Sequence, residues 1–172
     1  MPTREAFVDG VTAFLAARKS LGGIDSPQQW QPSRNGAHWC AKIPLALSGT
    51  LHGHTLVIEA NPSAAGSEFS IGIVIEDVCV TRLDFDESEG HTNSVALPRD
   101  GVPYIVSGSH IHRWESNHRF VEWPLSLPRL RNAVELPQSI RHFESALRWF
   151  CDEMNIDLPH GHRIELPLEL LL

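Results

Sequence analysis

Hydrophobic residues recur along the chain with the periods of two helices and of several strands. Residues 3–20 are predicted to form a helix that Thr3 caps at its start and Gly22-Gly23 ends. A second helix is predicted to begin near Pro137, because apolar residues then recur at intervals of three and four. The first apolar stripe consists of Phe7, Val8, Val11, Phe14 and Leu15, and the second of Ile140, Phe143, Leu147, Phe150 and Met154.

The residues between these helices have the alternation and β-branched content of strands. Segments 37–47 and 54–60 are predicted strands separated by a Ser-Gly-Thr turn. The run EFSIGIVIEDVCVTRLDF is the strongest β signal and predicts a hairpin that turns at Glu76-Asp77. Alternation along the second arm of this hairpin separates its side chains into two faces. One face carries Val78, Val80, Arg82, Asp84 and Asp86, and the other carries Cys79, Thr81, Leu83 and Phe85.

A further strand is predicted for the segment PYIVSGSHIHRW. If Gly108 introduces no bulge, one face of this strand carries Tyr104, Val106, His110, His112 and Trp114. The tail HRIELPLELLL alternates weakly, which is typical of an edge strand or of a contact with a partner. We therefore predict an α+β fold: a single domain over residues 1–172, with a mainly antiparallel sheet packed by an N-terminal and a long C-terminal helix.

Composition and charge narrow the class of protein. With 172 residues, 42% of them hydrophobic, the chain can bury a substantial core in one domain. The net charge of −7 gives no long-range attraction for a polyanion, which disfavours a general nucleic-acid binder. Three cysteines without a Cys-x-x-Cys motif fit reduced thiols, with Cys79 and Cys151 buried. The N-terminus lacks a signal-peptide pattern and no apolar run has membrane-spanning length, so we predict a cytoplasmic protein with no membrane contact.

Histidines are the main chemical clue, because imidazole binds metals and transfers protons near neutral pH. Six of the ten histidines form three His-x-His pairs. His52-Gly-His54 lies where a turn is predicted to meet a strand, so we expect exposed turn residues. His160-Gly-His162 follows the second predicted helix, and there we expect an interaction with the free carbonyls at the helix C-terminus.

His110-Ile-His112 differs because residues i and i+2 of a strand point the same way. The two imidazoles would lie about 6–7 Å apart on one face, which suits joint binding of one metal ion or one phosphate. A metal would need further ligands, and the preceding arm offers four candidates: His91, Asp84, Asp86 and Glu87. Such a set could hold zinc, manganese or iron, so the cofactor stays open as a candidate divalent metal.

A metal-free site is the alternative. One histidine would act as general base and the other as general acid, while Arg82 or Arg113 would stabilise an anionic transition state. Arg82 is better placed, because alternation puts Arg113 on the opposite face from the histidines. Asp84 would orient a histidine. The non-functional interpretation is a polar cross-strand pair on the sheet surface, covered by Trp114.

The order of elements around these residues resembles a family of small uncharacterised bacterial proteins and, more distantly, TumE-like toxin–antitoxin proteins. The resemblance rests on VTRLDF, EGHTN and GSHIHRW, followed by the helix SIRHFESALRWFCDEMNI, and covers about the last two thirds of the chain. The matching positions are Arg82, His91, Asn93, His110 and His112. The chain departs from the family after His91, where Thr-Asn-Ser stands in place of a proline and an Asp-Gly turn. The resemblance implies site residues rather than a reaction.

Two functions of different classes follow. The first is a small cytoplasmic bacterial protein of the toxin–antitoxin or phage-defence type that cleaves phosphoesters, with RNA as the expected substrate. His110 and His112 would do the acid–base work with assistance from His91. Arg82 would neutralise the phosphate, and Asn93 would bind the substrate. The second is a non-catalytic acidic module, such as an antitoxin, immunity protein or inhibitor of a nucleic-acid enzyme, that binds a basic partner surface. Whether the chain is an enzyme, and its oligomeric state, stay open.

Overall fold

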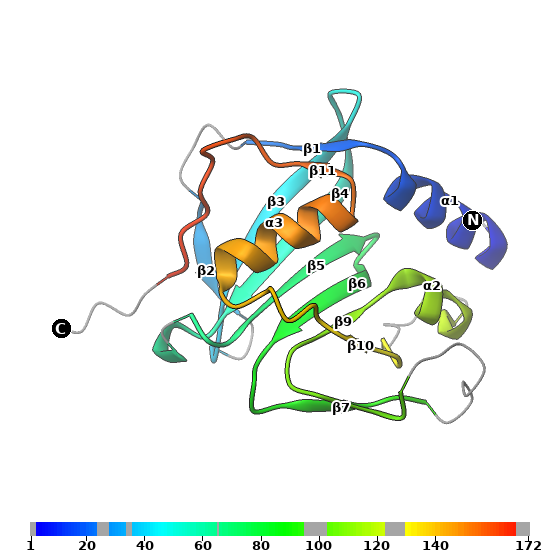
Figure 1. Cartoon of the computed structure of the whole chain (residues 1–172). Helices are drawn as coiled ribbons and strands as arrows, with labels where there is room; N and C mark the ends of the chain where they lie inside the picture. The colour runs from blue at the N-terminus through cyan, green and yellow to red at the C-terminus, as the bar shows by residue number, and fades with distance from the viewer. Residues whose placement is uncertain are drawn as a thin grey trace.

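A mainly antiparallel sheet organises the chain, as the prediction of an α+β fold requires (Figure 1). The computed structural model describes residues 3–23, 28–33, 36–64, 66–94, 103–122 and 130–167. Its nine-stranded sheet has the order β10-β9-β6-β5-β4-β3-β1-β11, with β2 paired to β3, and β7 and β8 form a separate two-stranded sheet. Neighbouring strands are antiparallel except β1 and β11.

The elements of the described residues have the following bounds. The helices are α1 (Arg4–Ala16), α2 (Trp114–Asn117) and α3 (Phe143–Glu153), with 3-10 turns η1 (Pro62–Ala64) and η2 (His118–Phe120). The strands are β1 (Lys19–Leu21), β2 (Trp30–Pro32), β3 (Trp39–Leu47), β4 (Thr50–Ala60), β5 (Phe69–Ile75), β6 (Val78–Phe85), β7 (Gly90–Thr92), β8 (Ile105–Ser107), β9 (His110–His112), β10 (Val134–Glu135) and β11 (Ile156–Asp157).

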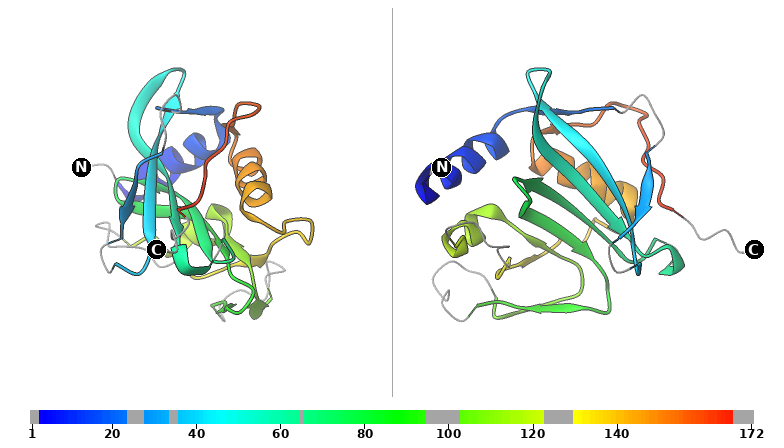
Figure 2. Two further views of the ribbon diagram at one scale, coloured as in Figure 1. Left: turned by 90° about the vertical axis from the view of Figure 1, so that its left-hand side faces the viewer. Right: turned by 180° about the vertical axis from the view of Figure 1, so that it is seen from behind.

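The core lies between the sheet and α3. Figures 1 and 2 show α3 across one face of the strands, and the view from behind in Figure 2 shows β3 to β6 in front of that helix. Phe69 stacks on Phe85 with ring centroids 4.7 Å apart and meets Phe143 of α3 edge-on at 5.1 Å. The apolar stripes predicted for the two helices supply buried residues to this core, among them Phe7, Val11, Phe14, Ile140, Leu147, Phe150 and Met154. Burial of these apolar side chains is the main stabilising term of such a domain.

Both helices are shorter than predicted, for different reasons. Thr3 caps α1 as expected, because its Oγ1 accepts from Ala6 N at 3.2 Å. The helix ends at Ala16 instead of at Gly22-Gly23, since the chain then enters β1 and the buried Lys19 amine closes the helix end. α3 begins at Phe143, well after Pro137. Its N-cap is His142, whose side chain accepts from Ser145 N in a capping box.

The hairpin turns decide where one pair of histidines lies. The turn at Glu76-Asp77 is confirmed, and both residues have positive φ, 49° and 65°, as a two-residue hairpin turn requires. The β3–β4 turn, however, lies at Ser48-Gly49, so β4 already includes His52 and His54. The prediction of turn residues is therefore wrong for this pair. His54 packs edge-on against the Phe14 ring of α1 at 4.3 Å.

A β-bulge changes which side chains of β6 share a face. Ile73 pairs with Thr81 but Val74 pairs with Cys79, so Val80 is an extra residue in β6. The bulge moves Val78 and Val80 into the core and leaves the half-buried Cys79 on the opposite face, with Arg82 and Asp84. The strict alternation assumed from the sequence was wrong before the bulge and correct after it. Cys151 is buried, as predicted.

Gly108 interrupts the strand predicted over residues 103–114. Its φ of +73° is a conformation that glycine adopts without strain, and it separates β8 from β9, which belong to different sheets. Trp114 starts α2 and packs against Phe7 with centroids 6.4 Å apart, so it does not cover the histidines. The interpretation of His110 and His112 as a surface pair covered by Trp114 is therefore wrong about Trp114.

The C-terminal segment also differs from expectation. After α3 and β11 the chain returns towards the start of α3. His162 there lines a pocket with Phe143 and Leu147, instead of contacting the C-terminus of the helix as predicted. Residues 162–167 form no regular strand, and the rest of the predicted edge strand lies outside the described residues. None of the described helices is long and apolar enough to cross a membrane.

Replacing Lys19 by methionine tests how α1 is closed. Lys19 is 1% exposed, and its amine donates to the carbonyl oxygens of Phe14, Leu15 and Ala17 at 2.9, 3.0 and 2.6 Å. Burial lowers its pKa to about 8, so the amine still carries its proton near neutral pH. Lys19→Met leaves three helix-end carbonyls without this donor, and we expect the free energy of unfolding in urea to fall by about 1–3 kcal/mol.

The control is Arg18→Met at the neighbouring position. Arg18 forms a solvent-exposed ion pair with Asp157, and such pairs contribute little to stability. Equal urea midpoints for wild type and Lys19→Met would contradict the role of the amine.

Candidate functional site

Pairing of β9 with β6 brings His110 and His112 opposite Asp84 and Arg82. In the antiparallel register, His110 faces Asp84 and His112 faces Arg82, and residues paired in this way share a face of the sheet. Leu83 and Ile111, which lie between them, are fully buried on the core face. The four polar side chains therefore lie on the face opposite the core, as predicted for the two histidines, Arg82 and Asp84.

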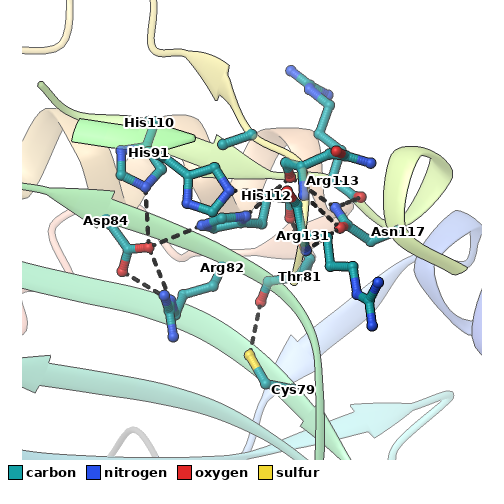
Figure 3. A network of polar contacts seen from close by, with 12 residues as sticks. Cys79, Thr81, Arg82, Asp84, His91, His110, His112, Arg113, Asn117 and Arg131 are labelled. Carbon is teal, nitrogen blue, oxygen red and sulfur yellow. Dashed lines mark hydrogen bonds and ion pairs between the residues drawn. The ribbon is translucent and has the colours of Figure 1, made fainter. Parts of the chain in front are cut away.

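The separate β7–β8 hairpin adds His91 to this group. Its ring centroid is 4.6 Å from that of His112 and 5.5 Å from that of His110, and the latter two are 5.1 Å apart. One ring nitrogen from each histidine lies within 4.8 Å of the others. Figure 3 shows the three rings gathered beside the Asp84 carboxylate. His91, which the sequence offered as a candidate partner of the His-x-His strand, thus lies beside it.

Backbone carbonyls fix the orientation of each imidazole. His91 Nε2 donates to Arg131 O at 3.0 Å, His110 Nδ1 to Gly108 O at 2.8 Å, and His112 Nδ1 to Asn132 O at 2.9 Å. Because a carbonyl oxygen can only accept, each of these nitrogens carries the proton of the ring. In a neutral ring the other nitrogen then has a free lone pair: Nδ1 of His91 and Nε2 of His110 and His112.

Charge at the site comes from Asp84 and Arg82. Asp84 Oδ2 lies 3.3 Å from His112 Nε2 and 3.5 Å from His110 Nε2, and Asp84 Oδ1 lies 2.8 Å from Arg82 Nε. Burial alone would raise the Asp84 pKa, but His112 and Arg82 more than offset this and hold it below its ordinary value. For His112, burial lowers the pKa and outweighs the opposing effect of Asp84. The Asp84 carboxylate thus favours its ionised form, and the buried His112 imidazole beside it loses its proton more readily than an ordinary histidine.

A segment that sequence analysis missed, residues 131–133, supplies two of the three carbonyls. It runs beside the cluster because the carboxamide of Asn117, 3% exposed, binds it from α2. Asn117 Oδ1 accepts from the backbone N–H groups of Arg131 and Asn132 at 2.8 and 2.9 Å, and its Nδ2 donates to Asn132 O at 2.9 Å. The sequence gives no signal for this role, because the contacting groups are main-chain atoms that every residue has.

Asn93 has a positioning role instead of the predicted substrate-binding role. It is 4% exposed, its Oδ1 accepts from Ala133 N at 2.6 Å and its Nδ2 donates to Ala133 O at 2.9 Å. Nδ2 also donates to Pro103 O. Its carboxamide is therefore fully engaged with the backbone, which fastens the hairpin that carries His91 to segment 131–133. Asn93 therefore lies beside the cluster and contacts main-chain atoms.

Three further sequence candidates do not join the cluster. Asp86 accepts from the backbone and hydroxyl of Ser88, and Glu87 is exposed. Arg113 pairs with Glu153 at 2.6 Å and lies over the Trp149 ring. Arg82 rather than Arg113 lies beside the histidines, and Asp84 is the acidic residue of this arm that contacts them.

An open groove of about 460 Å³ adjoins the cluster at Arg82 and Asp84. Its lining residues include one arginine, Arg82, one histidine, His38, and five carboxylates: Glu59, Glu68, Asp84, Asp86 and Glu89. The groove is therefore acidic, and its electrostatic potential attracts cations and repels polyanions.

Comparison of the chain with protein-family models, with curated proteins and with solved structures finds no match. The resemblance to TumE-like proteins thus stays a prediction, and the case for a site depends on the geometry described above.

Replacing Asn117 tests the support of the cluster. Asn117→Ala removes a carboxamide that makes four hydrogen bonds to backbone groups and leaves the N–H groups of Arg131 and Asn132 without their acceptor. We expect the free energy of unfolding to fall by about 2–4 kcal/mol, measured by urea denaturation. Glu115→Ala, an exposed change in the same short helix, should leave it unchanged. A stable Asn117→Ala variant would show that segment 131–133 is held by other contacts.

Proposed function

We propose that the protein is a hydrolase of phosphoester bonds, with RNA as the first substrate class to test, and that His91, His110, His112, Asp84 and Arg82 form its active site. The observation that supports this proposal is the convergence of three imidazoles and one carboxylate from β6, β7 and β9, each ring oriented by a backbone carbonyl. Groups that can take and return protons are the essential parts of such a site.

The exposures refine the roles expected from the sequence. His110 and His112 are 5% and 1% exposed, so they act from beneath the surface. His91 and Asp84 are partly exposed and can reach a bound substrate. One of these two would take the proton from water or from a ribose 2′-hydroxyl as the new P–O bond forms, and the leaving oxygen would depart with a proton from an imidazolium. Arg82, whose side chain is 44% exposed, would contact the phosphate.

The activity proposal is tested with two substrates, single-stranded RNA and a small chromogenic phosphodiester. We expect cleavage by the wild type and a loss of about 10²–10⁴-fold in rate for His91→Ala and for Asp84→Asn, because each removes a proton-transfer group. His160→Ala, at an exposed histidine far along the chain from the cluster, should keep the wild-type rate. Folded protein without activity on either substrate would refute the proposal. Growth arrest on expression, lost in the same variants, would support the toxin or phage-defence context.

The acidic groove favours a second candidate, a non-catalytic module that binds a basic partner such as a nucleic-acid enzyme. Its five carboxylates against one arginine suit a cationic surface better than a nucleic acid. Here Glu59→Lys combined with Glu68→Lys should weaken binding of a basic partner, while Asp84→Asn should leave most of it intact. The binding candidate predicts that the wild type inhibits a purified basic nuclease and that the double lysine variant does not. The phosphoesterase candidate predicts the reverse dependence: Asp84→Asn loses activity and the double lysine variant keeps it.

A further inference from the structure

We propose that His91, His110, His112 and Asp84 bind one divalent transition-metal ion, with zinc the best chemical match. This site deepens the phosphoesterase function: its catalytic consequence depends on that proposal, whereas metal binding itself does not. In the metal-bound form the four side chains would act as ligands, and water on the ion would take the place of the side chain proposed as proton acceptor.

Donor spacing is the first argument. A tetrahedral zinc centre with bonds of about 2.0–2.1 Å places its donor atoms about 3.3–3.4 Å apart. Asp84 Oδ2 lies 3.3 Å from His112 Nε2 and 3.5 Å from His110 Nε2, close to the donor–donor distance of a tetrahedral zinc centre. One ring nitrogen of each of the three histidines lies within 4.8 Å of the others, so His91 can supply the fourth donor.

The hydrogen bonds behind the histidines are the second argument. A metal-binding histidine characteristically donates its other N–H to a carbonyl or carboxylate, which fixes the ring and its tautomer. All three rings of this cluster do so, to the carbonyl oxygens of Arg131, Gly108 and Asn132. The bond between Asp84 and Arg82 Nε orients the carboxylate in the same way. Independent surface histidines have no reason to share this arrangement.

The third argument is an unpartnered buried atom. His112 is 1% exposed, and its Nε2 has no hydrogen-bond partner among the residues that the structure describes. Asp84 Oδ2 lies 3.3 Å from it, and while the His112 ring is neutral both atoms present electron pairs to each other and repel. A buried polar atom without a partner costs about 1–3 kcal/mol. A cation between the imidazoles and the carboxylate removes both penalties at once.

The donor set also selects the kind of metal. Three imidazole nitrogens and one carboxylate oxygen suit zinc, and also manganese or iron, whereas magnesium and calcium prefer oxygen ligands throughout. Three neutral rings and one carboxylate leave a divalent ion with a net charge of +1. That charge lies at the end of the acidic groove where Arg82 is exposed, and would offset the repulsion of a phosphate there.

The test uses untagged full-length protein. We expect elemental analysis to give about one zinc, manganese or iron per chain, chelation to lower the melting temperature, and added zinc to restore it. Cobalt substituted for that metal should show the strong visible absorption of a tetrahedral centre. His91→Ala, on the separate hairpin, and Asp84→Asn should weaken metal binding by more than about 10-fold. The matched control His52→Ala, at an exposed histidine of β4, should bind metal as the wild type does.

The outcomes distinguish this inference from the phosphoesterase proposal. Folded wild type that contains no metal, and whose melting temperature does not respond to zinc, manganese, iron(II) or cobalt, would overturn the metal site. A proton would then lie between Asp84 and the rings. Chelator-resistant phosphoesterase activity in metal-free protein would keep the proposed function and overturn the metal site. Stoichiometric metal without phosphoester cleavage would support the metal site and overturn the proposed function. If His91→Ala fails to fold, as judged by far-ultraviolet circular dichroism, Asp84→Asn carries the test alone.

Discussion

The three-residue pairing of β9 with β6 is the constraint on which the candidate site depends. It sets His110 against Asp84 and His112 against Arg82, with Leu83 and Ile111 between them in the core. Side chains of a strand alternate between faces, so a shift of one residue would turn both histidines into the core and Ile111 towards the polar face. Burial of Ile111 therefore fixes the register of the histidines. The hydrophobic core thus selects the geometry of the polar cluster on the opposite face of the sheet.

Buried asparagine residues hold together the segments around the histidine cluster. Asn93, Asn117 and Asn132 are almost fully buried, and their carboxamides bind backbone groups of segments that no regular ladder joins. A carboxamide offers both donors and an acceptor without a net charge, so it can satisfy such groups at depth without the desolvation cost of an ion. Around the cluster these residues take the place of sheet hydrogen bonds. These carboxamides join the hairpin with His91, α2 and segment 131–133 to one another, and segment 131–133 continues into β10, which pairs with β9 of the main sheet.

The sequence predicted what depends on periodicity and missed what depends on main-chain contacts. The apolar stripes, the hairpin at Glu76-Asp77 and the shared face of His110 and His112 follow from side-chain pattern and are observed. The bulge at Val80 and the break at Gly108 are local departures from regular geometry that alternation alone cannot reveal. The role of segment 131–133 was hidden, because a carbonyl oxygen is the same in every residue.

The orientation of the histidines by carbonyl groups has a consequence for how such sites can vary between proteins. The side chains of Gly108, Arg131 and Asn132 do not provide the atoms that hold the rings; their backbones do. An exchange of Arg131 for another residue would preserve its carbonyl contact with His91 wherever the backbone keeps its path. Two proteins could thus share the same arrangement of imidazoles while their sequences in this segment had diverged beyond detection, and a search for the same chemistry would have to compare backbone traces around histidine clusters.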